Sequence, residues 1–157
     1  MNPTRSAIDQ RVREVYAFVD ASVSAAAPRC DASGRCCRFA EYGHTLFLSH
    51  FEAEILLATA PPYTKPVGRE SCPFQVKGLC TARSERPLGC RIYFCDPHYE
   101  GVGEAITEEA LRRLKQIADE FQTGWRYAPL HQFLNDAERP NTTIPEELAR
   151  RIRLPLV

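Results

Sequence analysis

The seven cysteines of this 157-residue chain all lie between positions 30 and 95. They form two groups, which are Cys30, Cys36 and Cys37, and then Cys72, Cys80, Cys90 and Cys95. Cysteines that served only to pack a core would be spread along the chain, so this clustering needs a chemical cause. Thiolates are strong ligands for zinc and iron, and a metal or metal cluster is the best explanation.

The spacing of the cysteines bears on which metal they would hold. Structural zinc sites usually use C-x2-C pairs, and this chain contains none. Wide and uneven spacing fits more easily around a cubane, whose irons are spread over a few ångströms, than around one ion. We therefore favour an iron–sulfur cluster, most simply [4Fe–4S], with zinc as the alternative.

The cysteines belong to a longer ordered pattern: Gly34-x-Cys36-Cys37, Cys72-Pro73-Phe74, Gly78-x-Cys80 and Arg86-Pro87-x-x-Cys90-Arg91. This pattern resembles the YkgJ-type cysteine-cluster family over roughly residues 30 to 95. The resemblance implies a zinc- or iron-chelating domain, and some relatives are thought to hold an iron–sulfur cluster. Many members carry a further cysteine where this chain has Ser33, and Cys95 has no expected counterpart.

The resemblance implies Cys36, Cys72, Cys80 and Cys90 as the favoured metal ligands. Cys37, Cys30 and Cys95 come next, and seven thiols leave open whether there are one or two sites. Arg86 and Arg91 lie on either side of Cys90, where guanidinium groups would offset thiolate charge and raise a reduction potential. A solvated surface charge, or a pair with Glu41, Glu70 or Glu85, is the more common outcome for such an arginine, and Arg91 is the exception because the resemblance includes it. His98 stands at C-x2-H spacing from Cys95, but an exposed loop histidine is the more common outcome.

Bulk composition excludes several classes of partner. Acidic and basic residues balance at 20 each, so no net positive field attracts nucleic acid. No apolar run matches a secretory signal or a membrane span. We expect no nucleic-acid or membrane partner, and a cytoplasmic location in which thiols stay reduced.

Apolar periodicity predicts the helices that would surround the cysteines. The first covers 6–26, with an apolar stripe of Ile8, Val12, Val15, Tyr16, Val19 and Val23. Residues 45–48 are a weak strand candidate. Ser49 and Glu52 then form the pattern of a capping box, which predicts a helix to about 58, with His50 facing solvent. Residues 60–68 read as a loop, and 72–95 as mostly turns.

Three helices are expected in the second half of the chain. The first begins at Thr107, buries Leu111, Leu114, Ile117, Ala118 and Phe121, and stops near Gly124. The others cover 129–137, with Leu130, Phe133 and Leu134 on one side, and 143–151.

The predicted fold is mainly α: a small single domain, residues 1–157, of about four to five helices around an irregular, cysteine-lined metal centre, with little or no β-sheet. Residues 30–95 would form its core, packed by helical segments 6–26 and 107–151.

The predicted function is a metal-chelating cysteine-cluster protein whose iron–sulfur cluster serves redox chemistry, electron transfer or a partner enzyme. A zinc-stabilised interaction module, and a cluster-dependent modifying enzyme with an open iron, are the alternatives. Whether the protein is an enzyme stays open, and its protein partner is unidentified.

Overall fold

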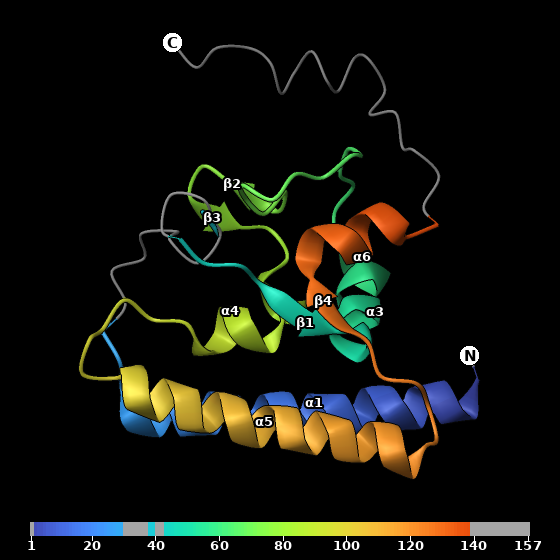
Figure 1. The fold of residues 1–157 in the computed structure, drawn as a ribbon, viewed down its shortest axis with the longest axis horizontal. Helices are drawn as coiled ribbons and strands as arrows, with labels where there is room; N and C mark the ends of the chain where they lie inside the picture. The colour runs from blue at the N-terminus through green and yellow to red at the C-terminus, as the bar shows by residue number, and fades with distance from the viewer. Residues whose placement is uncertain (1, 30–37, 40–42, 139–157) are drawn as a thin grey trace.

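A computed structural model describes residues 2–29, 38–39 and 43–138 of the chain (Figure 1). Its elements, in order, are α1 (Pro3–Ala26), β1 (Phe47–Ser49), α3 (His50–Thr59), β2 (Gln75–Val76), β3 (Leu79–Cys80), the 3-10 helix η2 (Arg83–Glu85), α4 (Leu88–Ile92), α5 (Glu100–Glu120), β4 (Tyr127–Pro129) and α6 (Leu130–Asp136). The described residues therefore form a mainly helical fold with two small antiparallel sheets, which confirms the predicted fold class.

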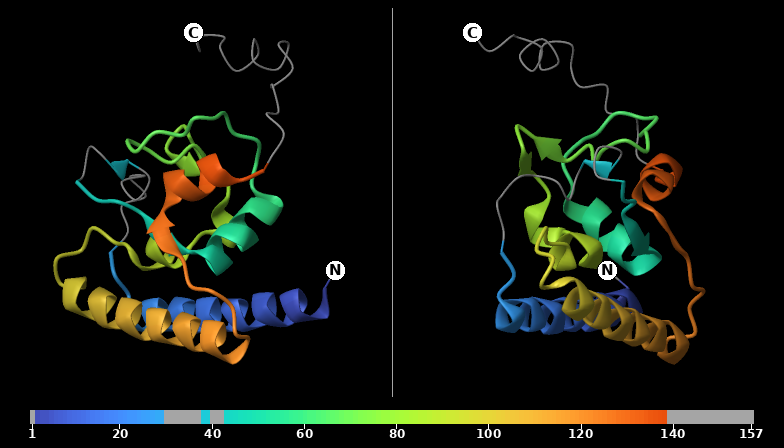
Figure 2. Two further views of the ribbon diagram at one scale, coloured as in Figure 1. Left: turned by 45° about the vertical axis from the view of Figure 1, so that its right-hand side comes forward. Right: turned by 60° about the vertical axis from the view of Figure 1, so that its left-hand side comes forward.

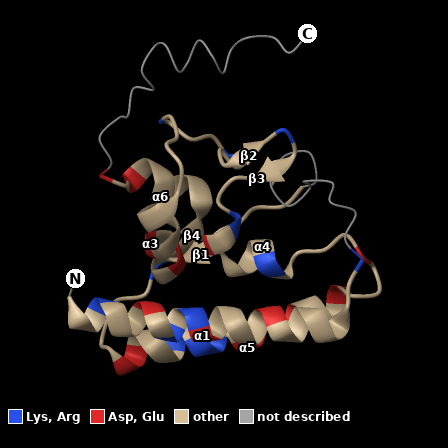
Figure 3. Cartoon of the chain, turned by 180° about the vertical axis from the view of Figure 1, so that it is seen from behind, with Lys and Arg blue, Asp and Glu red and all other residues tan. Residues whose placement is uncertain are grey.

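The long helices α1 and α5 lie side by side and form one layer, with the shorter elements above them (Figures 1 and 2). Both helices carry acidic and basic residues (Figure 3). No helix in the described part of the chain is both long and apolar enough to span a membrane. The predicted helix at 143–151 lies outside the described residues.

The first helix follows its apolar stripe. All six predicted stripe residues are buried. The helix begins at Pro3 rather than position 6, because the Asn2 side chain accepts a hydrogen bond from the amide of Thr4 at 3.0 Å and proline suits the first helical position. It ends at Ala26, where Ala27 takes a left-handed conformation with φ 48°.

The capping box predicted at the start of the second helix is present. The amide of Glu52 donates to Ser49 Oγ at 3.4 Å, and the amide of Ser49 donates to Glu52 Oε2 at 2.7 Å. The helix α3 that follows buries Phe51, Ile55 and Leu56, as the sequence indicates.

Helix α5 begins seven residues before the predicted start at Thr107, at Glu100. Gly101 and Gly103 disfavour a helix locally, which hides this start from sequence patterns. The ring of the N-cap residue Tyr99 lies against Gly103, where a Cβ would approach it to 2.9 Å, so this contact within the helix start favours glycine at position 103. The helix ends at Glu120 rather than near Gly124, and Leu111 and Phe121 are only partly buried.

Two hydrophobic cores hold the layers together. The helix-pair core joins α1 and α5 to α4 and one side of α3. The second, which we call the cysteine-side core, consists of Phe39, Leu46, Leu48, Ala53, Leu56, Val67, Cys72, Phe74, Ala82, Ala128, Leu130, Phe133 and Leu134. It includes the three apolar residues predicted for the last described helix. Strands β1 and β4 pair across it, with Leu48 opposite Ala128.

Candidate metal centre

A β-hairpin carries one favoured cysteine, Cys80, and a second, Cys72, lies just before it, where its carbonyl accepts a hydrogen bond from the amide of Gln75 at 3.3 Å. Strands β2 and β3 pair so that Gln75 lies opposite Cys80, and the amide of Thr81 donates to the carbonyl of Phe74 at 2.8 Å. The turn between them is Lys77-Gly78, with φ of 52° and 76°. Two consecutive positive φ values are typical of the type I′ turn that closes tight hairpins. The prediction that residues 72–95 are mostly turns is therefore corrected here, where a regular hairpin forms.

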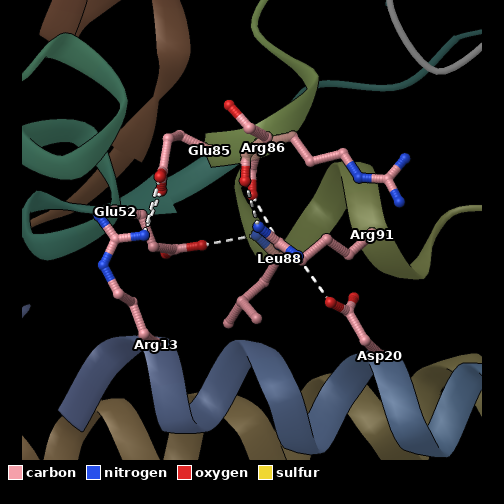
Figure 4. Close-up of polar contacts among 8 residues, drawn as sticks. Arg13, Asp20, Glu52, Glu85, Arg86, Leu88 and Arg91 are labelled. Carbon is pink, nitrogen blue, oxygen red and sulfur yellow. Dashed lines mark hydrogen bonds and ion pairs between the residues drawn. The ribbon is translucent and has the colours of Figure 1, made fainter. Parts of the chain in front are cut away.

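The short helix α4 carries the third described favoured cysteine, Cys90. The helix was not predicted, because five residues carry no readable period. Its start is held by Glu52 of α3, whose Oε1 accepts a hydrogen bond from the amide of Leu88 at 2.8 Å (Figure 4). Its side packs closely, since a Cβ at Gly89 would lie 2.6 Å from Leu46 Cδ1.

Glu52 is a structural residue of the candidate centre that the sequence identifies only as a local cap. Its side chain is 1% exposed and joins the start of α3 to the start of α4. Burial raises the pKa of its carboxyl, and hydrogen bonds from Ser49 and Leu88 offset part of that effect. The capping-box pattern could find the bond to Ser49, but no local signal indicates the bond to Leu88.

Arg91 turns toward α1. Its Nε donates to the carbonyl of Arg86 at 2.8 Å, its Nη1 to Asp20 Oδ2 at 2.8 Å and its Nη2 to the carbonyl of Ser84 at 3.1 Å (Figure 4). Its guanidinium also lies 4.2 Å from the centroid of the Tyr16 ring. These contacts join the segment before Cys90 to helix α1. The Arg91 side chain therefore fixes the position of that segment relative to the helix layer.

Arg86 behaves differently. Its side chain is partly buried and extends away from the polar contacts around Arg91 (Figure 4). Burial lowers the pKa of its guanidinium, the positive charges of Arg83 and Arg91 lower it further, and Cys90 opposes the shift. No described residue forms an ion pair with this guanidinium, since Glu85 pairs instead with Arg13 at 2.8 Å. A partly buried guanidinium that forms no ion pair with a described residue, and whose pKa Cys90 and Asp20 both act to raise, therefore lies near Cys90.

Three of the four favoured ligands contact the same core. Cys72 is buried within the cysteine-side core, and Cys80 and Cys90 are partly buried against it. Within residues 2–29, 38–39 and 43–138, no three His, Cys, Asp or Glu side chains are already grouped as metal ligands. The thiols nevertheless suit a thiolate-bound centre chemically, and the unpaired Arg86 suits its negative charge.

Cys95 is not part of the cysteine-side core. It lies on the wall of a cavity beside α5, and its thiol is 4.0 Å from the hydroxyl of Tyr93. His98 is exposed, as expected of a loop histidine, and its backbone amide donates to Asp96 at 3.0 Å. Cys30, Cys36 and Cys37 lie outside the described residues.

His50 differs from its predicted environment. His50 was predicted to face solvent, but it is partly buried, with its ring 4.0 Å from that of Phe51 and 6.1 Å from that of Trp125. Its Nδ1 accepts a hydrogen bond from the amide of Arg126 at 3.3 Å, and burial lowers its pKa. The pairing of β1 with β4 brings the Trp125 segment to it, which local periodicity does not reveal.

Comparison of the chain with family models, curated proteins and solved structures finds no match. The function must therefore be inferred from the residues and geometry of the centre itself.

Proposed function

We propose that this protein is a metal-chelating cysteine-cluster protein that holds an iron–sulfur cluster, [4Fe–4S], in support of redox chemistry, electron transfer or a partner enzyme. The proposed ligands are Cys36, Cys72, Cys80 and Cys90. The observation that carries the proposal is that three of these thiols, one before a hairpin, one on it and one on a separate helix, contact one apolar core. Arg86, which forms no ion pair with a described residue, lies near one of them, Cys90.

The apolar surroundings favour thiolates that are bound to a metal over thiolates that are free. A lone thiolate beside Phe74 and Leu46 would be poorly solvated, whereas metal ligation spreads its charge. A bound cluster would also supply the one-electron chemistry that the chain's own side chains lack. Phe39, three residues after Cys36 in the sequence, packs in the same core.

Arg86 is the residue we assign to charge balance. Its guanidinium has no carboxylate partner among the described residues, so a cluster with four thiolates would provide the missing negative charge. Arg91 is instead assigned to positioning Cys90, because its nitrogens are engaged by Arg86, Asp20 and Ser84. Its charge still contributes to the field around the centre.

Anaerobic purification with analysis of iron, zinc and acid-labile sulfide tests the metal. The proposal predicts about four irons and four sulfides per chain, with a brown colour and absorbance near about 400 nm. About one zinc without sulfide would indicate the zinc-stabilised module instead. A well-folded chain with no metal of either kind would refute a metal centre altogether.

Single cysteine variants test the ligands. Cys72→Ala and Cys90→Ala are expected to lose most of the metal and to lower the melting temperature, because metal binding and folding are coupled. Cys95→Ala is the matched control, since Cys95 lies on a cavity wall away from the cysteine-side core, and it should keep its metal. Full metal content in either of the first two variants would show that the ligand assignment is wrong.

Arg86→Gln tests charge balance in the cluster-loaded protein. Removing the positive charge should lower the reduction potential, because the more negative reduced state loses its nearest compensation. Arg83→Gln is the control, since Arg83 is exposed and lies in the same turn. Equal potentials for the Arg86 variant and the wild type would exclude a role for Arg86 in balancing the cluster.

A further inference from the structure

A cavity separate from the cysteine-side core lies between the end of α4, residues 93–99 and the first turns of α5. Its volume is about 670 Å³, and its walls include the apolar side chains of Ile92, Phe94 and Pro97. Pockets of about 300–1,000 Å³ are the size that takes small organic molecules. Its one described lining cysteine, Cys95, is not among the four ligands proposed for the metal centre.

One side of the cavity is acidic. Glu100, Glu104 and Glu108 follow one another at intervals of four residues, so they share one face of α5, and all three line the cavity. None of them has an ion pair with any described residue, and no Lys or Arg is among the described lining residues. Like charges at this spacing repel one another and weaken the helix.

Two other acidic residues of the same helix form ion pairs. Glu109 is paired with Arg112 at 2.7 Å and with Arg113 at 2.8 Å, and Glu120 is paired with Arg11 at 2.7 Å. Two acids of the helix away from the cavity are therefore neutralised by arginines, whereas the three glutamates at the cavity have no ion pair with a described residue. The unneutralised negative charge of these glutamates favours binding of a cation at this side of the cavity.

One of the lining residues, Tyr99, also has a buried hydroxyl. Tyr99 is 5% exposed, and its hydroxyl has no hydrogen-bond partner within the described part of the chain. Buried polar groups are almost always hydrogen-bonded, so an unpartnered one beside a cavity is consistent with a partner supplied by a ligand. Asp96, by contrast, already accepts hydrogen bonds from the backbone amides of Arg29 and His98.

We propose that this cavity binds an organic cation with an apolar body, namely a primary amine that carries an aromatic or branched aliphatic group. The apolar walls bury the body, and the ammonium group lies at the row of three glutamates. The ligand is recognised by charge and shape, and its binding does not depend on the metal centre.

Isothermal titration calorimetry on the full purified chain tests this, with 2-phenylethylamine and cyclohexylmethylamine as probes. The neutral 2-phenylethanol has a similar shape and is the control ligand. Both amines are expected to bind, and phenylethylamine should bind about tenfold more tightly than the alcohol, because several carboxylates contribute. Failure of both amines to bind, or equal affinity for amine and alcohol, would overturn the proposal.

Variants of Glu104 locate the site. Glu104→Gln should weaken amine binding about fivefold, the size of one exposed ion pair. Glu104→Lys places an ammonium between Glu100 and Glu108, so it should abolish the preference for amine while keeping or raising the melting temperature. Asp119→Asn, an exposed acid of α5 outside the cavity, should bind as the wild type does. Wild-type amine affinity in Glu104→Lys would refute this location.

Discussion

Replacing Glu52 by alanine is expected to lower the free energy of unfolding by about 2–4 kcal/mol. The carboxylate accepts hydrogen bonds from the amides of Ser49 at 2.7 Å and Leu88 at 2.8 Å, in a site where Glu52 itself is 1% exposed. Each buried donor left without an acceptor costs about 1–3 kcal/mol, and relief of the buried charge offsets part of the sum. Against a total stability of about 5–15 kcal/mol, the loss is large.

Glu52→Gln separates the hydrogen bonds from the charge. Glutamine keeps the volume and one carbonyl oxygen, so it should cost less than alanine, about 1–2 kcal/mol. Glu54→Gln on the same helix is the control, because Glu54 is exposed and forms a surface ion pair with Arg5. That change should alter stability by less than about 1 kcal/mol.

The charge of Glu52 also gives stability a specific pH dependence. Burial raises the pKa of Glu52 above its ordinary value of 4.5, so the folded protein holds this proton more tightly than the unfolded chain does. The contribution of Glu52 to stability is therefore greatest below pH 4.5 and falls as pH rises through the native pKa. In Glu52→Gln, that component of the pH dependence should be absent.

Urea denaturation followed by circular dichroism, at several pH values, measures all of these effects. Unchanged slopes with denaturant would show that the variants differ in stability and not in the extent of unfolding. A Glu52→Ala midpoint within about 1 kcal/mol of the wild type would refute the inferred bridge between α3 and α4. A pH dependence of Glu52→Gln that matches the wild type would refute the effect of the charge.

Three further predictions use the same assays. Arg91→Met removes three hydrogen bonds and should cost about 2–3 kcal/mol in urea denaturation; a loss below about 1 kcal/mol would contradict its anchoring role. Gly78→Ala should lower the free energy of unfolding by about 1 kcal/mol, because φ at Gly78 is 76°. Lys77→Asn should stabilise the turn slightly, because asparagine tolerates a positive φ. Equal urea midpoints for the two variants would argue against the type I′ hairpin. Two neighbouring arginines, Arg112 and Arg113, lower the pKa of Glu109 to about 2. The contribution of ionised Glu109 to the stability of the folded protein is therefore present above pH 4.5 and is lost as pH falls toward about 2. Melting temperatures between pH 5 and 2 should decline less for Glu109→Gln than for the wild type, and parallel declines would count against that pairing.

The candidate centre could be predicted only in part. Cysteine spacing indicated the two segments, and the structure brings Cys72, Cys80 and Cys90 to one core while Cys95 lies on a separate wall. Spacing cannot make that distinction, because Cys90 and Cys95 are separated by a helix end and a bend whose direction depends on packing against α5. The metal itself and the ligand set stay predictions.

Local signals in the sequence determined the elements whose evidence lies within a few residues. The stripe of α1 sets its buried face, and Ser49 with Glu52 sets the start of α3, because helical geometry places such residues side by side. Only the tertiary structure decided which distant groups those elements would meet. Glu52 binds an amide 36 residues later, and Arg91 reaches Asp20 on α1. The physical reason is that a periodic pattern records which face is apolar but not which partner covers it, and that choice is made when the two cores pack.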